Sequence, residues 1–366
     1  MLVRHLALFL SFFGGGGVER VMLNLAKGFV DKGLNVDLIL RKARGPFLSK
    51  VPPDIRIVNV ESSHFMTSFA KTVQYMRKER PLALLSAGYF SNVIAIWAKR
   101  LARVPTRVMV TAHDNPIYVR GDIKTRLMYL FGGYFYRWAD DVVAVSKGVS
   151  DGIARITGMS PSCIRVIYNP VIMPDFFDQA KKPLNHPWFT ASSPPVILGA
   201  GYLYPWKDFA TLIKAFAIVR AHRLARLVII GEGEGRHMLE TLVHDLKLDN
   251  DVALIGFVDN PYAYMKRSRV FVLSSIREGL PTVLIEAMAC GTPVVSTDCP
   301  SGPAEILEGG RYGKLVPVGD IEALAKAILT TLDSQMDPTP LIQRACTFSL
   351  DNAINQYLEV LNFATR

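Results

Sequence analysis

Two glutamates in the second half of the chain have the spacing of a ligand-binding pair. Glu278 stands just before Gly-Leu-Pro-Thr, and Glu286 follows Thr282 by four residues, which puts Glu286 and Thr282 on one face of a helix. Carboxylates at this spacing can bind two sets of hydroxyl groups on either side of a diphosphate. Taken alone, the pair also fits an ordinary α/β unit with two solvated glutamates.

The loop between the glutamates fits the amino end of a helix that binds an anion. A short apolar run rich in β-formers precedes the loop, and Pro281 suits the first helical position because its missing N–H would have no partner there. Gly291 is placed to end the helix, and a second apolar run follows it. Backbone N–H groups around Gly279, Leu280 and Thr282, together with the helix dipole, would favour a phosphate.

Lys207 lies at the mouth of another predicted helix. Residues 201–208, which include Tyr202, join a strand expected over 196–200 to a helix expected over 209–220. A lysine in this position can neutralise a diphosphate leaving group. The alternative is a solvated surface lysine.

Further turns at the ends of predicted strands carry glycine or apolar residues. Gly15 and Gly16 belong to a glycine run between the first strand and the first helix, Gly231 opens Gly-Glu-Gly, and Phe257 and Val258 follow another strand. Glycine lets the backbone approach a ligand closely, and backbone groups beside an apolar side chain can pair with the edge of a nucleobase. The first turn is not a dinucleotide-binding fingerprint, because the third glycine and the later acidic residue are missing.

His113 follows an apolar strand, in the sequence Val-Met-Val-Thr-Ala-His-Asp. A histidine at the carboxyl end of a strand in an α/β fold faces the edge of the sheet where ligands bind. It can donate a hydrogen bond to a ligand hydroxyl or hold a proton near neutral pH. The alternative is a histidine that caps a loop.

Apolar runs and amphipathic stretches alternate along the chain, which predicts parallel α/β sheets. In the first half we expect strands over 6–10, 35–40, 55–60, 82–86, 107–111, 141–145 and 164–168, and helices over 18–32, 66–79, 91–103, 123–138 and 147–157. The proline-rich residues 171–195 resemble a linker in composition. We therefore expect a first domain over 1–170, a second over 196–348 and a final helix within 349–366.

Length and cysteine content agree with a two-domain protein of the cytosol. A chain of 366 residues exceeds a typical single domain. Its four cysteines have no paired spacing, so we expect reduced thiols rather than a disulfide framework or a zinc site. The apolar run at the amino terminus is short for a signal peptide, and the apolar runs fall below the ~18 residues of a membrane span.

Charge is distributed unevenly between the two halves. Residues 1–175 carry 24 Lys and Arg against 12 Asp and Glu, a net charge of +12, whereas residues 176–366 carry 18 against 20. A basic first half favours an anionic partner such as an acidic membrane surface or a lipid diphosphate. Nucleic acid is a competing interpretation, although neither a zinc spacing nor an RNA-binding aromatic signature supports it. A third interpretation is that the basic surface serves only to keep the protein soluble.

The full string Glu-Gly-Leu-Pro-Thr-(x)3-Glu-Ala-Met-Ala-Cys-Gly-Thr-Pro-Val-Val, at residues 278–295, resembles the signature of glycosyltransferase family 4. The resemblance covers nearly the whole chain. It implies an α/β protein of GT-B fold, with two doubly wound Rossmann-like domains facing across a cleft and the last helix packed back on the first domain. The acceptor would bind the first domain and a nucleotide-sugar the second, and the sugar would be transferred with retained anomeric configuration.

The resemblance also assigns roles to individual residues. Lys207 would stabilise the departing diphosphate, Glu278 would hold sugar hydroxyls near the reacting carbon, and His113 would orient the sugar or the acceptor. The donor-binding positions would be Gly15, Gly16, Tyr202, Gly231, Phe257, Val258, Gly279, Leu280, Thr282 and Glu286, the last of these on the ribose. Tyr202 replaces the arginine that the family usually has, and Arg277 is a candidate to compensate for it. No metal ion and no other cofactor is expected.

The resemblance thus implies a hexosyl- or N-acetylhexosaminyl-transferase that uses a nucleotide-sugar, with a UDP-sugar favoured because the family favours it. The predicted acceptor is a glycan or a lipid-linked sugar in cell-surface polysaccharide or glycoconjugate synthesis. We expect a cytoplasmic enzyme, peripheral on the inner face of the cell membrane, with the basic amphipathic stretches 66–80 and 129–138 as candidates for membrane contact and no nucleic acid partner. Two alternatives are a nucleotide-sugar epimerase or hydrolase of similar fold, and a non-catalytic nucleotide-sugar-binding protein.

Overall fold

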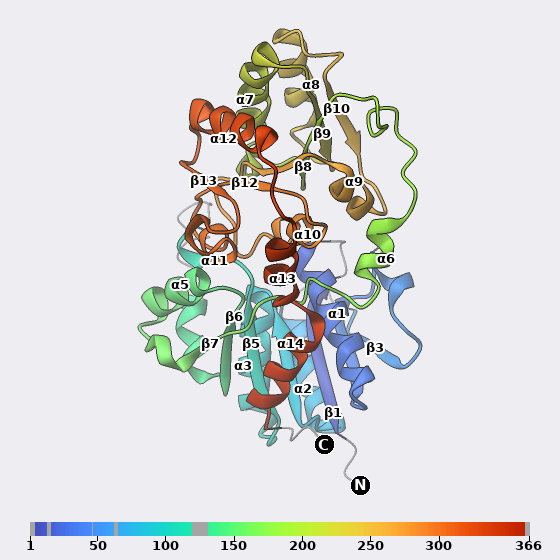
Figure 1. Ribbon diagram of the computed structural model, residues 1–366. Helices are drawn as coiled ribbons and strands as arrows, with labels where there is room; N and C mark the ends of the chain where they lie inside the picture. The colour runs from blue at the N-terminus through green and yellow to red at the C-terminus, as the bar shows by residue number, and fades with distance from the viewer. Residues whose placement is uncertain (1–3, 13–15, 46, 62–64, 119–130, 363–366) are drawn as a thin grey trace. The chain divides into compact units, whose positions relative to one another are not determined.

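The chain forms two compact α/β units (Figure 1). The computed structural model describes residues 4–12, 16–45, 47–61, 65–118 and 131–362. The first unit comprises Met1–Pro170 with Leu350–Arg366, and the second comprises Val171–Ser349. The predicted fold class, two doubly wound α/β domains, is confirmed.

The first unit is built on a seven-stranded parallel sheet with the strand order β3-β2-β1-β4-β5-β6-β7. Its strands β1 and β4 are buried almost throughout, as expected where helices cover both faces of a parallel sheet. The strands are β1 His5–Phe12, β2 Asn35–Lys42, β3 Ile55–Asn59, β4 Ala83–Ala87, β5 Arg107–Ala112, β6 Asp141–Ala144 and β7 Ile164–Val166. The helices are α1 Gly17–Asp31, α2 Phe65–Glu79, α3 Tyr89–Ala102, α5 Lys147–Thr157 and α14 Leu350–Val360, with short 3-10 turns η1 Leu48–Lys50, η2 Pro116–Tyr118, η3 Phe135–Trp138 and η4 Pro161–Cys163.

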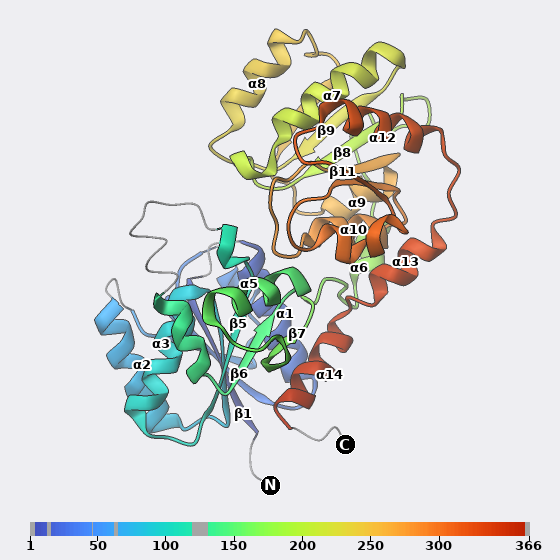
Figure 2. The ribbon, with the colours of Figure 1, turned by 90° about the vertical axis from the view of Figure 1, so that its left-hand side faces the viewer.

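Helices α2 and α3 lie on one side of this sheet, and α1 and α14 on the other (Figure 2). The final helix can approach α1 closely because Gly28 has no side chain: a Cβ there would lie 2.7 Å from Ile354 Cγ1. Phe29 and Tyr357 pack edge to face beside it, with ring centroids 6.2 Å apart. The last helix is therefore part of the first unit.

The second unit has a six-stranded parallel sheet with the strand order β10-β9-β8-β11-β12-β13. Helices α7 and α12 pack together on one face, and α9 and α10 on the other (Figure 2). The strands are β8 Val196–Ala200, β9 Arg226–Ile230, β10 Val252–Gly256, β11 Val270–Leu273, β12 Val294–Thr297 and β13 Lys314–Val316. The helices are α6 Phe176–Lys181, α7 Phe209–His222, α8 Arg236–Asp245, α9 Pro261–Arg267, α10 Thr282–Ala289, α11 Pro303–Ile306, α12 Ile321–Asp333 and α13 Thr339–Cys346, with 3-10 turns η5 Pro205–Lys207 and η6 Glu308–Gly310.

The expectation that residues 171–195 form a linker is wrong for their first part. Helix α6 packs on α9, with the Phe176 and Tyr262 rings 4.4 Å apart and Asn260 donating to the Gln179 carbonyl at 2.8 Å. Phe176 is 2% exposed. The burial of this apolar side chain outweighs the proline-rich composition.

The two stretches predicted to contact a membrane have different surroundings. In α2, the apolar residues Val73 and Met76 are buried, so this part of the stripe belongs to the core, whereas Met66 is 68% exposed. Of the helix predicted over 123–138, only residues 131–138 are described, and they form a helical turn followed by η3. Among the described residues, no helix combines the length and the apolar character needed to cross a bilayer.

Candidate functional site

The strand order of the second unit reverses between β8 and β11, and this switch point positions the candidate site. Both strands are parallel neighbours, so the loops that follow them leave the sheet side by side at its carboxyl edge. Ligands of open α/β sheets bind at such a point. Lys207 lies in the loop after β8 and Glu278 in the loop after β11.

Lys207 and Glu278 form a salt bridge across the two loops. The Lys207 Nζ lies 2.6 Å from the Glu278 Oε1, and the two side chains are 16% and 11% exposed. The Ser275 hydroxyl donates to the same carboxylate oxygen at 2.6 Å. The positive charge of Lys207 is therefore balanced by Glu278, and hydrogen bonds hold both groups in place.

Two hydrogen bonds to backbone carbonyls join the loop after β8 to the loop after β11, next to the Lys207–Glu278 pair. The Ile276 N–H donates to the Trp206 carbonyl at 2.8 Å, and the Ser274 hydroxyl donates to the Lys207 carbonyl at 2.8 Å. Asp208 caps helix α7 by accepting from the Thr211 N–H at 3.2 Å. These contacts fix where the lysine leaves the backbone.

Helix α10 begins at Thr282, with Pro281 as its N-cap rather than its first residue. The preceding loop is packed against Gly302, whose φ of +96° suits only glycine and where a Cβ would lie 2.5 Å from the Pro281 Cδ and 3.3 Å from the Gly279 carbonyl oxygen. Leu280 is 7% exposed, so it contributes backbone rather than side chain to the surface. The helix has no acidic residue in its first turn, which leaves its amino end electropositive.

Of the two predicted carboxylates, Glu278 lies in the loop before this helix and Glu286 lies within it. Glu286 is 3% exposed within α10. Burial, with the negative charge of Glu286, raises the pKa of the Cys290 thiol to about 12. Burial, with the charge of Glu278, does the same to the Cys299 thiol. Cys290 and Cys299 therefore stay protonated at neutral pH.

Three backbone turns meet at the same edge of the sheet. The Gly231 N–H donates to the Gly256 carbonyl, and the Gly201 N–H donates to the Ile230 carbonyl, each at 2.9 Å. Gly231 has a φ of +138°, and a Cβ there would lie 1.9 Å from the Gly201 carbonyl oxygen. Phe257, the residue after Gly256, is 75% exposed, and Val258 beside it is half-buried. The structure thus brings the predicted donor-binding turns together within the second unit.

An aromatic stack fills the loop where the arginine was expected. The rings of Tyr202 and Tyr204 are 5.6 Å apart, and those of Tyr204 and Trp206 are stacked at 4.6 Å. The guanidinium of Arg277 lies 5.2 Å from the centre of the Trp206 ring. A second cation is therefore held next to the Lys207–Glu278 pair.

His113 lies in the first unit, at the end of β5, and lines a cavity of about 70 Å³. The cavity is mostly apolar and is also lined by Val18, Tyr89, Ile153 and Ile156. A buried network of Ser86, Asn92, Thr111 and Tyr136 hydrogen bonds lies behind the histidine.

The hydrogen bonds around His113 define its protonation. The Thr111 hydroxyl donates to the Ser86 carbonyl at 2.9 Å, so it accepts from the His113 Nε2–H at 3.0 Å. This leaves Nδ1 as an acceptor, and it has no hydrogen-bond partner among the described residues. Burial lowers the pKa of His113 to about 4. The expectation of a proton held near neutral pH is therefore wrong, because the surroundings of the ring disfavour its charged form.

The first glycine loop is described only from Gly16 onward, and Gly15 lies outside the described residues. Gly16 is the N-cap of α1, where a Cβ would lie 2.5 Å from the Glu19 Oε2. Burial raises the pKa of the Glu19 carboxyl.

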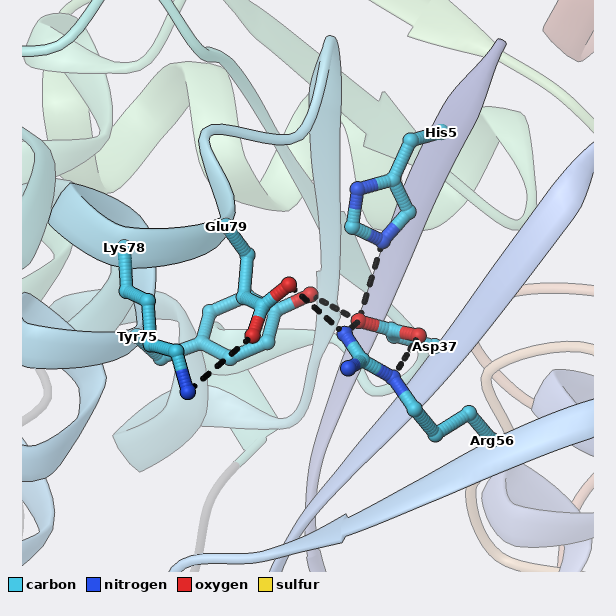
Figure 3. Close-up of polar contacts among 6 residues, drawn as sticks. All are labelled: His5, Asp37, Arg56, Tyr75, Lys78 and Glu79. Atoms are coloured by element: carbon cyan, nitrogen blue, oxygen red, sulfur yellow. Dashed lines mark hydrogen bonds and ion pairs between the residues drawn. The ribbon is translucent and has the colours of Figure 1, made fainter. Parts of the chain in front are cut away.

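A separate charged cluster lies near the amino ends of β1, β2 and β3 (Figure 3). Asp37 is 4% exposed and accepts hydrogen bonds from Arg56 Nε at 2.8 Å and from the Tyr75 hydroxyl at 2.5 Å, with His5 Nε2 2.9 Å away. Glu79 also pairs with Arg56, at 3.0 Å. The partners of Asp37 occupy both of its oxygens, so this cluster is structural rather than catalytic. Across the described ranges, this cluster included, no group of three or more His, Cys, Asp or Glu side chains is arranged to hold a metal ion.

Sequence reasoning missed the residues that orient the predicted ones. Ser275 holds Glu278, Trp206 holds Arg277, and Thr111 sets the tautomer of His113. The hydroxyl residues at the carboxyl ends of β5 and β11 were the available signal, since side chains at that edge face the ligand.

Comparison with known proteins covers both units. The family description "Glycosyltransferase Family 4" matches residues 15–173, and "Glycosyl transferases group 1" matches residues 183–347. A relative from Campylobacter jejuni, N-acetylgalactosamine-N,N'-diacetylbacillosaminyl-diphospho-undecaprenol 4-alpha-N-acetylgalactosaminyltransferase, is 28% identical over 90% of this chain and 91% of its own. The lipopolysaccharide core biosynthesis glycosyltransferase LpsE of Rhizobium meliloti is 27% identical over 94% of this chain and 96% of its own.

Solved structures share the fold. The lipopolysaccharide outer core galactosyltransferase WaaB has a TM-score of 0.77 at 20% identity and covers 98% of this chain and 99% of its own. Anabaena HepE in complex with UDP has a TM-score of 0.79 at 22% identity and covers 99% of this chain and 100% of its own. With two Rossmann-like units and both family descriptions matched, the chain belongs to the family 4 glycosyltransferases of GT-B fold.

Proposed function

We propose that this enzyme transfers a sugar from a nucleotide-sugar, with UDP favoured as the nucleotide, to a lipid-linked or cell-surface glycan acceptor. The names of the Campylobacter and Rhizobium relatives, which specify a diphospho-undecaprenol acceptor and the lipopolysaccharide core, support the acceptor class. The UDP bound to the Anabaena structure supports the nucleotide. The observation that carries the proposal is the salt bridge between Lys207 and Glu278 beside the amino end of α10.

The proposed mechanism retains the anomeric configuration. The bond between the anomeric carbon and the diphosphate oxygen breaks while the acceptor oxygen bonds to the same face of the sugar, and the acceptor proton passes to the departing phosphate. Negative charge grows on the diphosphate as this bond breaks. Lys207 and the N–H groups at the start of α10 stabilise that charge, which is why the proposal requires no metal ion.

The remaining side chains bind and orient the donor in this proposal. Glu278 accepts hydrogen bonds from sugar hydroxyls while Ser275 holds it in place, and Glu286 accepts from the ribose hydroxyls. The exposed ring of Phe257 offers a surface for the nucleobase. In the first unit, the neutral Nδ1 of His113 accepts from a hydroxyl of the sugar or the acceptor.

The donor class is tested by a thermal-shift panel of UDP-, GDP-, ADP- and CMP-sugars, followed by turnover with candidate acceptors. We expect a UDP-sugar to raise the melting temperature and to be consumed only when an acceptor is present. Equal consumption without acceptor would instead identify a hydrolase or an epimerase. A panel in which UDP-sugars cause no shift while another nucleotide does would contradict the choice of UDP.

The ribose role of Glu286 is tested with Glu286→Gln, which keeps the volume of the buried side chain. We expect about a tenfold loss of UDP affinity, because the charged carboxylate acceptor becomes a neutral amide with one acceptor oxygen. The same loss should be absent for 2′,3′-dideoxy-UDP, which has no ribose hydroxyls to bind. An equal loss for both nucleotides would show that Glu286 acts through the fold and not on the ribose.

We further propose that the enzyme works at an anionic membrane surface, on the inner face of the cell membrane. The net charge of +12 on residues 1–175 and the lipid-linked acceptor of the Campylobacter relative support this location.

A further inference from the structure

Helix α3 exposes apolar residues along one side. Phe90, Trp97 and Leu101 are 43%, 38% and 52% exposed, and their spacing of seven and four residues puts them on one face. The far side of the helix, with Ala95 and Ile96, is buried against the sheet. An apolar stripe on a surface helix normally faces the core, so a solvent-facing one marks a binding surface.

Residues 131–138 extend this stripe into a wider patch. The Trp97 ring packs edge to face on Phe135 at 5.1 Å and on Trp138 at 5.0 Å. Phe131 and Tyr134, on the same segment, are 69% and 51% exposed. We call the surface made by Phe90, Trp97, Leu101, Phe131 and Tyr134 the α3 face.

Arginines lie against aromatic rings of the α3 face and against Trp138, which packs on Trp97. The guanidinium of Arg100 lies 4.2 Å from the centre of the Trp138 ring, and that of Arg137 lies 5.1 Å from the centre of the Tyr134 ring. Arg103, at the end of α3, is also exposed. The neighbouring carboxylates Asp140 and Asp141 are each paired with another cation, Lys99 and Arg107 respectively. The face therefore combines apolar rings with positive charge.

Exposed aromatic rings with arginines beside them fit an anionic lipid bilayer better than other partners. Tyrosine and tryptophan rings with arginine side chains are characteristic of the boundary between lipid headgroups and acyl chains, where the ring is buried and the cation meets a phosphate. An anionic bilayer also complements the net charge of +12 on residues 1–175. Helix α2, which lies beside α3 on the same side of the sheet (Figure 2), buries Val73 and Met76 in the core and exposes Met66, at 68%.

We propose that the α3 face docks on an anionic lipid bilayer, with Trp97, Leu101 and Phe131 entering the headgroup layer and the arginines binding lipid phosphates. The proposal rests on the proposed function, since a lipid-linked acceptor would be met at such a surface. Binding of the α3 face to vesicles can be measured without measuring sugar transfer.

The test is co-sedimentation of the full-length protein with phosphatidylcholine vesicles, with and without about 30% phosphatidylglycerol, at low and high salt. Two variants are compared with the wild type: Leu101→Gln/Phe131→Gln, which removes exposed apolar groups, and Arg100→Glu/Arg103→Glu, which reverses two charges. Matched controls in the second unit are Leu224→Gln/Met238→Gln, whose side chains are 54% and 55% exposed, and Lys247→Glu/Lys326→Glu, whose lysines are exposed.

We expect the wild type to bind the anionic vesicles in a salt-sensitive manner and both α3-face variants to lose affinity by about tenfold or more, while the controls bind like the wild type. The melting temperature and its shift with UDP should stay at wild-type values in all four variants, which separates a loss of docking from a loss of folding or of donor binding. Absence of wild-type binding, or equal losses in variants and controls, would overturn the proposal. So would a dimer in sedimentation velocity that the Leu101→Gln/Phe131→Gln variant abolishes, because a second copy would then cover the face.

Discussion

Tyr202 stands where the family usually carries an arginine, and this exchange changes the charge of the donor site. Lys207 is already balanced by Glu278 at 2.6 Å, so a diphosphate needs a further cation nearby. Arg277, which precedes Glu278, is held 5.2 Å from the centre of the Trp206 ring, and Trp206 precedes Lys207. At the scale of single residues, we therefore expect Arg277 to replace the missing arginine.

This replacement is tested by measuring UDP affinity calorimetrically in Arg277→Ala. We expect about a tenfold loss, because a charge-assisted hydrogen bond to the diphosphate is removed. Adding Tyr202→Arg to the same chain should recover affinity by returning a cation to the neighbouring loop. Arg311→Ala, an exposed arginine of the same unit, serves as the control. Unchanged affinity in Arg277→Ala would mean that Lys207 and α10 suffice.

The identities of the site residues were readable from the sequence, but their contacts were not. Glu278 and Lys207 were each found from a motif, yet they are 71 residues apart, and only the sheet order makes the loops after β8 and β11 neighbours. The tautomer of His113 depends on a threonine hydroxyl whose own donor direction is set by the Ser86 carbonyl. Such chains of hydrogen bonds have no sequence period and appear only in three dimensions.

At the scale of elements, alternation of strands and helices was enough to predict the two sheets. Hydrophobic periodicity was less informative about which helix face is covered, because α2 and α3 are both amphipathic and only packing decides. Val73 of α2 is buried, whereas Trp97 of α3 is exposed. The proline-rich composition of 171–195 likewise hid the packed helix α6.

The charged cluster around Asp37 joins β1, β2, β3 and α2, and it makes the stability of the first unit depend on pH (Figure 3). Burial acts to raise the pKa of Asp37, but hydrogen bonds from Arg56, Tyr75 and His5 outweigh it and lower the pKa. A carboxyl group with a lowered pKa stabilises the fold above its ordinary pKa. That stabilisation is lost as the pH falls through its ordinary range and below it.

Asp37→Ala is therefore expected to destabilise the first unit by about 2 kcal/mol at pH 7, below the full value for a buried ion pair because Arg56 is half exposed. The difference from the wild type should shrink as the pH falls below 4. Urea unfolding measures it, followed by fluorescence in a Trp188→Phe/Trp206→Phe background that leaves Trp97 and Trp138 as reporters of the first unit. Asp54→Ala, an exposed aspartate in the same unit, is the control. A loss that does not vary with pH would show that the aspartate acts through packing and not through its charge.

At the scale of the whole molecule, we expect the two units to have different roles. The second unit contains the Lys207–Glu278 pair, the start of α10 and the three meeting turns, all groups suited to a nucleotide-sugar. The first unit contains His113 with its small apolar cavity, and it carries the basic α3 face. Donor recognition is thus expected to survive variants that abolish lipid binding.

We propose that the amino end of α10 and Lys207 together bind the diphosphate of the donor. The most direct measurement compares the dissociation constants of UDP and uridine in the wild type, in Lys207→Gln and in the control Lys247→Gln. We predict that Lys207→Gln weakens UDP by about tenfold and leaves uridine unchanged, because only UDP carries the diphosphate. Equal effects on UDP and uridine, or no effect on either, would contradict the account.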